Sequence, residues 1–468
     1  MLFIRSNSFP LSLPDGERLR LLKTLAARGL NPLVRSTRYK LLQSLAGQRG
    51  DASQLEAECA SLGASAPERA FTPGELFCAG DCVFYLTFGG DGALGAGVIY
   101  DIETAEPLPK LERFCRDVRE ALGEIGAAAT QPERSTELML LQPEASTLPT
   151  ALSRFMALQP ADFMRAEAAF RGGRGLARAS ELMEGRAVRA FLRSAQEMRR
   201  EGFTPRRLFA EAASLGVSIE RMMEAGLLES EVRVSCRKSG HALFDLPSPD
   251  SLAAVTISKA KCSLCAAPVA DEVIEQTINP TRLAVSLLED GRWLTNRIYK
   301  IVRALGVPES EIATGPASPH GESYLVANVC GNSFLFVTRD GDMTPAFCRR
   351  VAEMVEETDA SHLVAVVTGA AEDEGRMRLY EFAWRRARDG RDLGMTLAEG
   401  LGAARAQIEA AFEMAVRREL TRRLFGLDAA LGFSAAGFVL GWFRLMRASD
   451  AARQSADVQA RVTVGSGR

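Results

Sequence analysis

Lysine and histidine are scarce in this chain, which has seven lysines and three histidines among 468 residues. Arginine supplies most of the positive charge, and 57 basic residues stand against 59 acidic ones, for a formal net charge of −2. A chain without a global excess of positive charge lacks the electrostatic field of a non-specific nucleic-acid coat protein. Any contact with nucleic acid must therefore come from a local cluster of basic residues.

Cysteine occurs as an odd number, nine, at irregular spacings, which argues against a disulfide framework. The first ten residues lack the apolar run of a secretory signal. A hydrophobic content of 47% excludes disorder throughout, because it is enough to build hydrophobic cores. We therefore expect a cytoplasmic protein of roughly three domains, at a prior of about 150 residues per domain.

Common enzyme motifs are also missing. The chain has neither the phosphate-binding pattern G-x-x-x-x-G-K-[ST] nor the nucleophile elbow G-x-S-x-G. The glycine-rich residues 89–92 fit a hairpin turn better than a phosphate loop, because no suitable helix follows them. The sequence thus offers no catalytic residue, and we expect the protein not to be an enzyme.

Two kinds of pattern alternate along the chain. Apolar residues at helical spacing indicate helices in residues 15–66 and 151–229, and β-branched and aromatic runs that indicate strands follow each helical region. This order predicts a multidomain α+β fold in which a helical, winged-helix-like module and a β-β-α-β module occur twice. The predicted domains are a helical module at 1–70, a β-β-α-β module at 71–150, a helical module at 151–230, a zinc-ribbon-like segment at 231–270, a helix pair at 271–308, a second β-β-α-β module at 309–372 and a helical C-terminal region at 373–468.

A short internal match supports the duplication. Residues 114–120 read FCRDVRE and residues 347–353 read FCRRVAE, and each heptapeptide lies on the helix predicted after a hairpin. Upstream, Tyr39-Lys40 and Tyr299-Lys300 open a second pair of similar segments. The alternative is a chance match between helix-forming residues. We favour a divergent internal duplication, because order and context both repeat.

A cysteine cluster in the middle of the chain has the spacing of a zinc ribbon. Cys262 and Cys265 form a Cys-x2-Cys knuckle, and Cys236 begins the other knuckle. Ser239 stands where the second cysteine of that knuckle is expected, and His241 is a chemically sound replacement ligand. The pattern predicts one structural Zn²⁺ held by Cys236, His241, Cys262 and Cys265. The alternative is a ribbon that has lost its metal.

The second β-β-α-β module carries Glu322 near the start of one strand and Val337-Thr338-Arg339 on the next. Its element order over residues 310–370 resembles the core of restriction-endonuclease-like nucleases, the PD-(D/E)xK group. In that family an acid on one strand and an acid-x-Lys on the next hold Mg²⁺ and a water-activating amine. Valine cannot bind Mg²⁺, and arginine is always protonated. The resemblance implies a nuclease-like fold without nuclease activity; a generic α/β sensor or dimerisation fold is the alternative.

The helix predicted over residues 292–305 combines an apolar stripe with basic and amide side chains. This pattern is typical of a DNA-recognition helix, and also of any solvated arginine-rich helix. The candidate nucleic-acid-binding residues are Arg292, Asn296, Arg297, Lys300 and Arg303.

Residues 424–443 approach the length of a membrane span and contain one charge, Asp428. Glycine, alanine and serine lower the hydrophobicity of this segment and permit close helix packing, so we favour a helix that packs on a protein surface over a membrane anchor.

These observations predict a non-catalytic binding or scaffold protein, linked to nucleic acid in a DNA-associated or defence complex. Two alternatives stay open: a metal-dependent nuclease with a divergent site, and a membrane-anchored adaptor that uses residues 424–443. The predicted partners are DNA, a protein partner or second copy bound through the C-terminal helix, or a membrane.

Overall fold

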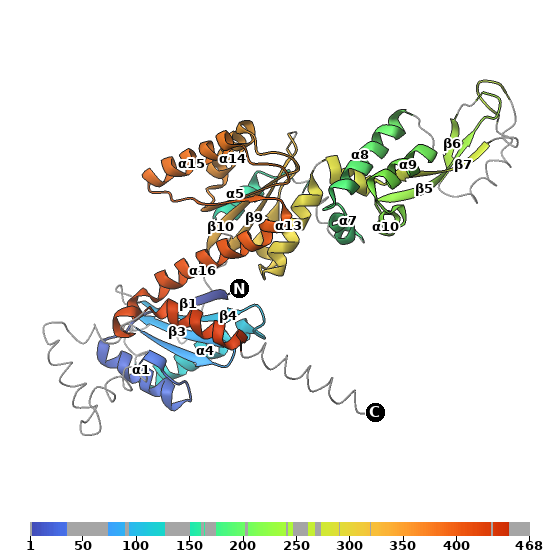
Figure 1. Ribbon diagram of the computed structural model, residues 1–468. Helices are drawn as coiled ribbons and strands as arrows, with labels where there is room; N and C mark the ends of the chain where they lie inside the picture. Colours follow the sequence, from blue (N-terminus) through green and yellow to red (C-terminus); the bar gives the residue numbers. More distant parts are fainter. Residues whose placement is uncertain are drawn as a thin grey trace, which may run out of the picture. The chain divides into compact units, whose positions relative to one another are not determined.

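The computed structural model describes residues 2–34, 74–88, 93–126, 150–160, 163, 175–201, 205–239, 242–246, 261–266, 273–289, 291–318, 320–431 and 434–448 (Figure 1). The chain divides into two units. Unit 1 comprises Met1–Leu148, Val329–Asn332 and Glu409–Arg468, and unit 2 comprises Pro149–Asn328 and Ser333–Ile408. Each unit has helices, a sheet and a hydrophobic core, which confirms the predicted multidomain α+β fold.

Unit 1 is built on a four-stranded sheet with strand order β1-β4-β3-β2 and antiparallel pairing throughout. Phe84, Leu86 and Phe88 alternate along β3 and share one core with buried residues of α1 and α4, so these two helices cover one face of the sheet. On the other face, Arg423 of α16 donates a hydrogen bond to the hydroxyl of Tyr85 (3.4 Å). The elements of unit 1 are β1 (Leu2–Ser12), α1 (Asp15–Ala27), β2 (Gly74–Ala79), β3 (Cys82–Phe88), β4 (Ala93–Asp101), α4 (Pro107–Glu124), the C-terminal part of α16 (Leu401–Leu431) and a helical stretch at 435–448.

The region predicted as a helical module at residues 1–70 begins with a strand instead. β1 pairs with β4 from Leu2 opposite Asp101 to Ser12 opposite Ala93. Its register shifts after Phe9, where Pro10 has no N–H to offer to the ladder. The sequence LFIRSNSFPLS shows no strict alternation of apolar and polar residues, so periodicity does not reveal this edge strand. Its pairing partner lies far along the chain.

The apolar residues 424–443 fall into two helices of unit 1 rather than one. α16 ends at Leu431, and the next helical stretch covers 435–448. Each helix buries part of its apolar side chains, namely Leu424, Leu427, Ala435, Ala436, Val439 and Phe443, whereas Phe425 is exposed. Among the helices that the structure describes, none has both the length and the hydropathy of a membrane span.

Unit 2 contains a five-stranded sheet with strand order β12-β11-β10-β9-β8. β8 pairs antiparallel with β9, and β10, β11 and β12 run parallel to one another. The elements of this sheet layer are α5 (Thr150–Ala157), η5 (Glu309–Glu311), β8 (Ile312–Thr314), β9 (Glu322–Val329), β10 (Asn332–Arg339), α14 (Pro345–Thr358), β11 (His362–Val367), α15 (Asp373–Arg388) and β12 (Gly394–Glu399). α5 and α14 share one core with the sheet, to which they contribute Phe155 and Phe347.

Between α5 and β8 the chain forms helices and a small sheet, in the region predicted as a helical module, a zinc-ribbon-like segment and a helix pair. The segment predicted as the helix pair at 271–308 begins with a strand, because β7 pairs with β5. The helices are α7 (Leu176–Leu182), α8 (Arg186–Glu201), α9 (Pro205–Leu215), α10 (Ile219–Glu224), α12 (Arg282–Glu289) and α13 (Arg292–Ala304). A three-stranded sheet, ordered β6-β5-β7, consists of β5 (Leu228–Ser235), β6 (Ala242–Leu246) and β7 (Val273–Pro280).

The β-β-α-β order predicted for the module at 309–372 is that of β9, β10, α14 and β11, which β8 precedes. α14 begins where the hydroxyl of Thr344 accepts a hydrogen bond from the N–H of Phe347 (3.3 Å), and Pro345 occupies the first helical turn. β12 lies in the region predicted as helical at 373–468. It is a short edge strand whose parallel partner β11 becomes adjacent only through the crossover helix α15.

The two matching heptapeptides occupy similar places. Phe114 and Cys115 are buried on α4, which follows strands β2, β3 and β4, and Phe347 and Cys348 are buried on α14, which follows β8, β9 and β10. In both helices the matching Phe-Cys pair therefore faces a core. The segment at Tyr39-Lys40 lies outside the described residues, and the duplication stays a prediction.

Candidate functional site

Glu322 lies at the start of β9 and is completely buried. β9 and β10 are neighbours in the sheet, and α14 packs over the face that carries Tyr324 and Val337. Because side chains alternate along a strand, Glu322 shares a face with Tyr324, and Arg339 shares a face with Val337. The structure therefore brings together the three positions that the nuclease resemblance singles out.

Two arginines bind the carboxylate of Glu322. Arg339 Nη1 lies 3.0 Å from Oε1, and Arg350 of α14 donates from Nε to both oxygens (3.1 Å each) and from Nη2 to Oε1. The hydroxyl of Ser318 donates to Oε2 at 2.6 Å. Each carboxylate oxygen thus already accepts hydrogen bonds from the protein, and we call Glu322, Arg339 and Arg350 the arginine-bound acid.

The charges around Glu322 favour its ionised form. Burial alone raises the pKa of this carboxyl, but the hydrogen bonds from Arg350 and Ser318 and the charges of Arg350 and Arg339 outweigh burial, so its pKa is lowered. The hydrogen bond to Glu322 in turn raises the pKa of Arg350. The carboxylate of Glu322 and the two guanidinium groups therefore form charge-assisted hydrogen bonds with one another.

The position of the second acid is apolar. Val337 is fully buried in the core formed with Phe347 and Val351 of α14. A divalent cation at this point would meet one carboxylate, two guanidinium groups and a valine, and hard cations require several oxygen ligands. This arrangement is suited to holding β9, β10 and α14 together, rather than to binding Mg²⁺.

Three of the four predicted zinc ligands lie together. Cys236 follows β5, and Cys262 and Cys265 lie in the connection that leads to β7; the three Sγ atoms all lie within 4.8 Å of one another. The Sγ atoms of Cys236 and Cys265 are 3.3 Å apart. Tetrahedral Zn–S bonds of about 2.3 Å separate sulfurs by about 3.7 Å, so the cluster fits a metal of this size. His241 lies outside the described residues.

Ser239 occupies the expected place of the missing cysteine. Its hydroxyl oxygen lies 3.7 Å from Sγ of Cys262. Hydrogen bonds from the backbone N–H groups of Cys265 and Leu264 lower the pKa of the Cys262 thiol to about 7. Thiolates are the form of cysteine that binds metal, so the turn favours the ligating state.

The predicted nucleic-acid residues of α13 mainly contact the protein itself. Asn296 donates to the hydroxyl of Ser180 (2.7 Å), and Arg297 pairs with Glu184. Arg303 donates to the backbone oxygen of Val307 (2.6 Å).

The remaining two candidates are Lys300 and Arg292. Burial lowers the pKa of Lys300, and the guanidinium of Arg292 lies 5.9 Å from the ring centre of Phe163. Nucleic-acid contact through α13 stays a prediction.

Sequence reasoning missed Arg350 and Asp340. Asp340 follows β10 and pairs with Arg189 (3.4 Å) and Arg193 (2.5 Å) of α8, and the guanidinium of Arg189 lies over the ring of Trp293 (4.4 Å). The one available signal for Arg350 was its place in the repeated heptapeptide, where the first copy has Asp117. Neither residue belongs to a motif that spacing reveals, because its partners come from other elements.

Comparison of the chain with protein-family models, with curated proteins and with solved structures finds no match in any of the three.

Proposed function

We propose that this protein is a non-catalytic binding or scaffold protein, linked to nucleic acid, whose nuclease-like core is closed by the arginine-bound acid. The observation that carries the proposal is that the carboxylate of Glu322 already accepts hydrogen bonds from Arg339, Arg350 and Ser318. The strand order of the five-stranded sheet, with the acid at the start of β9, supports the resemblance to nuclease cores.

Neighbouring acids do not supply an alternative metal site. Asp340 is paired with two arginines, and an oxygen of Asp342 accepts a hydrogen bond from the backbone N–H of Ala370 (2.8 Å). Within the described residues, the cysteine cluster is the one group of three or more potential ligands close enough to hold a metal. This favours a structural metal over a catalytic one.

The metal that suits the cluster is Zn²⁺, with Cys236, Cys262 and Cys265 as ligands and His241 as the fourth. Three thiolates and an imidazole use all four positions of a tetrahedral site, so no position remains for a substrate or a reactive water. The role of the zinc in this proposal is to fix the turns at the end of the β6-β5-β7 sheet.

The test uses full-length protein with labelled duplex DNA and Mg²⁺ or Mn²⁺, scored for cleavage and for a mobility shift. We expect no cleavage by the wild-type protein. Cleavage by the wild type that Glu322→Ala abolishes would establish the alternative, a metal-dependent nuclease with a divergent site.

A double substitution on α13 tests whether this helix binds nucleic acid. We expect Arg292→Ala combined with Lys300→Ala to weaken the shift and to reduce its salt dependence, because each phosphate contact contributes to the salt slope. Arg349→Ala is the matched control, since this exposed arginine lies on α14, away from α13. A protein that shifts no duplex at low salt would remove nucleic acid from the proposal.

A further inference from the structure

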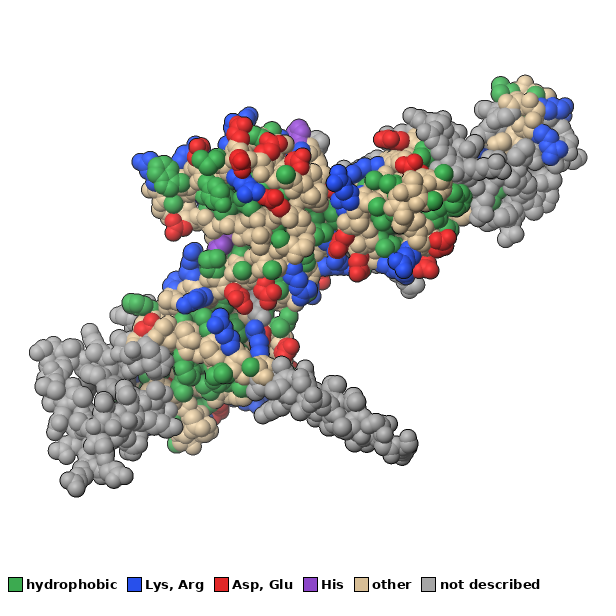
Figure 2. All heavy atoms as spheres, in the orientation of Figure 1, with side chains coloured by type: hydrophobic (Ala, Val, Ile, Leu, Met, Phe, Trp, Pro, Cys, Tyr) green, Lys and Arg blue, Asp and Glu red, His purple; other side chains and the backbone are tan. Residues whose placement is uncertain are grey.

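α15 exposes three large apolar side chains on one face. Met377, Tyr380 and Trp384 are 59%, 56% and 63% exposed, and their spacing of three and four residues places them in one stripe. Figure 2 shows hydrophobic side chains at the surface in the region of α15. Large apolar side chains that line up in this way indicate an interaction surface, whereas scattered ones do not.

The opposite face of α15 is already used. Leu379 is fully buried in the core of unit 2, and Arg386 is buried and pairs with Glu356 and Asp359 of the α14 region. The exposed stripe therefore points away from the sheet and α14.

Each end of the stripe carries a charge. Asp373 lies one turn before Met377, and Arg388 lies one turn after Trp384, so both are on the same face as the stripe. The guanidinium of Arg388 is 5.0 Å from the ring centre of Trp384. Within the described part of the chain, neither Asp373 nor Arg388 has an ion-pair partner. The ion pairs that other residues of α15 make lie inside the unit: Glu374 pairs with Arg378, Arg376 with Glu399, and Arg386 with Glu356 and Asp359.

This order of residues is complementary to itself when reversed. If a second α15 lies antiparallel, with the two-fold axis between positions 380 and 381, Asp373 faces Arg388 of the other copy and Met377 faces its Trp384. Tyr380 then lies beside the axis. A two-fold contact requires that residue i meet j while j meets i, and this stripe meets that requirement in both charge and apolar character.

We propose that α15 is the contact surface of a symmetric dimer of this protein, in which two antiparallel copies pair through Asp373, Met377, Tyr380, Trp384 and Arg388. Tyrosine, tryptophan and arginine are the residues that contribute most at protein interfaces. α15 has 16 residues and is about 24 Å long, so the contact is smaller than a standard interface. The dimer is accordingly a weak, concentration-dependent one. The proposal is independent of the proposed function.

The experiment is sedimentation velocity of the full-length protein over roughly 1 to 200 µM, a range that brackets a micromolar Kd. We expect Asp373→Arg alone, and Arg388→Asp alone, to weaken self-association at least about tenfold, because each places like charges opposite each other twice. An equimolar mixture of the two variants, and the double variant, should both recover dimerisation. Only an antiparallel self-pairing predicts both recoveries.

Trp384→Ala should weaken the dimer by a similar factor. Phe425→Ala is the matched control, because Phe425 is 71% exposed but lies on α16 and outside the stripe, so it should change nothing. A protein that is monomeric over the whole range, or a dimer that the single charge reversals leave intact, would overturn the proposal. Recovery in the mixture also shows that the single variants are folded.

Discussion

Glu322 is a fully buried carboxylate at the start of β9. Its place near the start of a strand suggested a metal ligand, and its burial alone would make an ionised carboxylate costly. The structure surrounds it with Arg339, Arg350 and Ser318, so the charge is paired and hydrogen-bonded. Removing Glu322 leaves the partly buried guanidinium groups of Arg339 and Arg350 without their acceptor, whereas removing an arginine takes a partner from a fully buried carboxylate.

Glu322→Ala should destabilise unit 2 by about 1.5–3 kcal/mol, the usual contribution of hydrogen bonds to a charged group, because the two guanidinium groups that lose their acceptor are partly exposed to water. Glu353→Ala, on the exposed side of α14, should change stability by at most about 0.5 kcal/mol. Hydrogen exchange of β9 and β10 amides across a urea series measures both effects. Equal protection in the two variants would contradict the structural role of the arginine-bound acid.

The stability of unit 2 should also depend on pH through Glu322. The pKa of its carboxyl is lowered in the folded protein from the ordinary value of 4.5. Its stabilising contribution is therefore fully present above that ordinary value, and it is lost as pH falls from there through the lower folded pKa. Glu322→Gln removes the titrating group, so the wild type should lose more stability than this variant on acidification. Parallel unfolding curves at pH about 6 and about 3 provide the comparison.

At the scale of elements, the C-terminal helices show why hydropathy alone was insufficient. The apolar character of residues 424–443 is continuous in sequence, but an oxygen of Asp428 accepts a hydrogen bond from the N–H of Ala435 (2.8 Å), and the hydroxyl of Ser434 accepts one from the N–H of Gly437 (3.1 Å). Both bonds cap the N-terminus of the helix at 435–448. The single charge in the segment is thus a structural residue of unit 1.

Asp428→Ala should destabilise the helix at 435–448 by about 1 kcal/mol, the typical value of an N-terminal cap. Asp428→Asn keeps an acceptor oxygen and should retain most of that stability. The measurement is the exchange rate of the amides in 435–448, compared with those of α4 as an internal reference. Unchanged exchange in Asp428→Ala would show that packing of Val439 and Phe443 is sufficient to hold this helix.

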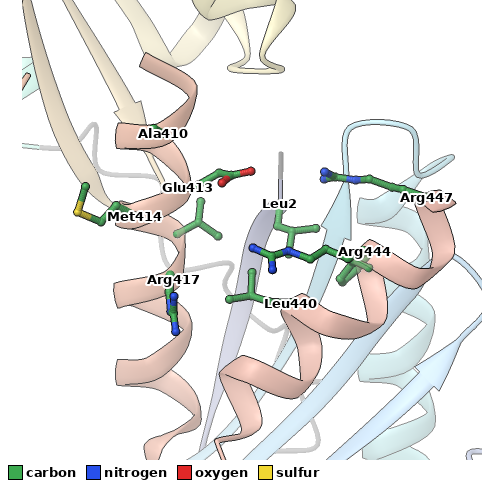
Figure 3. Close-up of a pocket in the computed structure, with 10 residues that line it drawn as sticks. Leu2, Ala410, Glu413, Met414, Arg417, Leu440, Arg444 and Arg447 are labelled. Atoms are coloured by element: carbon green, nitrogen blue, oxygen red, sulfur yellow. The ribbon is translucent and has the colours of Figure 1, made fainter. Parts of the chain in front are cut away.

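The surroundings of this helix also contain a cavity of about 270 Å³ within unit 1, which Figure 3 shows between α16 and the helix at 435–448. Leu2, Leu440, Arg417 and Arg444 are among the residues that line it. Arg447, another lining residue, is paired with Asp101 of β4 at 2.5 Å. This ion pair joins the C-terminal helix to the sheet, independently of the cap at Asp428.

At the scale of the whole molecule, the two hydrophobic cores and the cysteine cluster are separate. The core of unit 1 contains Phe84 and Phe114, and that of unit 2 contains Val337 and Phe347, whereas Cys236, Cys262 and Cys265 belong to neither. Loss of a metal from the cluster should therefore lower the stability of the β6-β5-β7 sheet and leave the two hydrophobic cores unchanged.

Elemental analysis of the purified protein should find about one zinc per chain. Chelation, or Cys262→Ser, should raise amide exchange in β5, β6 and β7 and leave that of β3 and β10 unchanged. Cys78→Ser, a cysteine of β2 outside the cluster, serves as the control for metal content. Undiminished zinc in Cys262→Ser would show that the cluster is not the metal site.

Features that depend on residues close together in the chain were predictable without the structure. The α+β fold class, the order of strands and helix in the module at 309–372, and the Cys-x2-Cys knuckle followed from periodicity and spacing, because each depends on residues close together in sequence. The absence of an acid-x-Lys pattern at Val337 and Arg339 was equally visible.

Contacts between groups far apart in the chain depend on how the elements pack. β1 requires β4, β12 requires the crossover through α15, and Glu322 requires Arg350 from α14; no local pattern marks any of these pairings. The same is true of the stripe on α15: its spacing is in the sequence, but its exposure became known only when the core was seen to bury Leu379 on the other side. Burial is a property of the whole packed unit, which is why residues with the same character, such as Leu379 and Met377, have opposite environments.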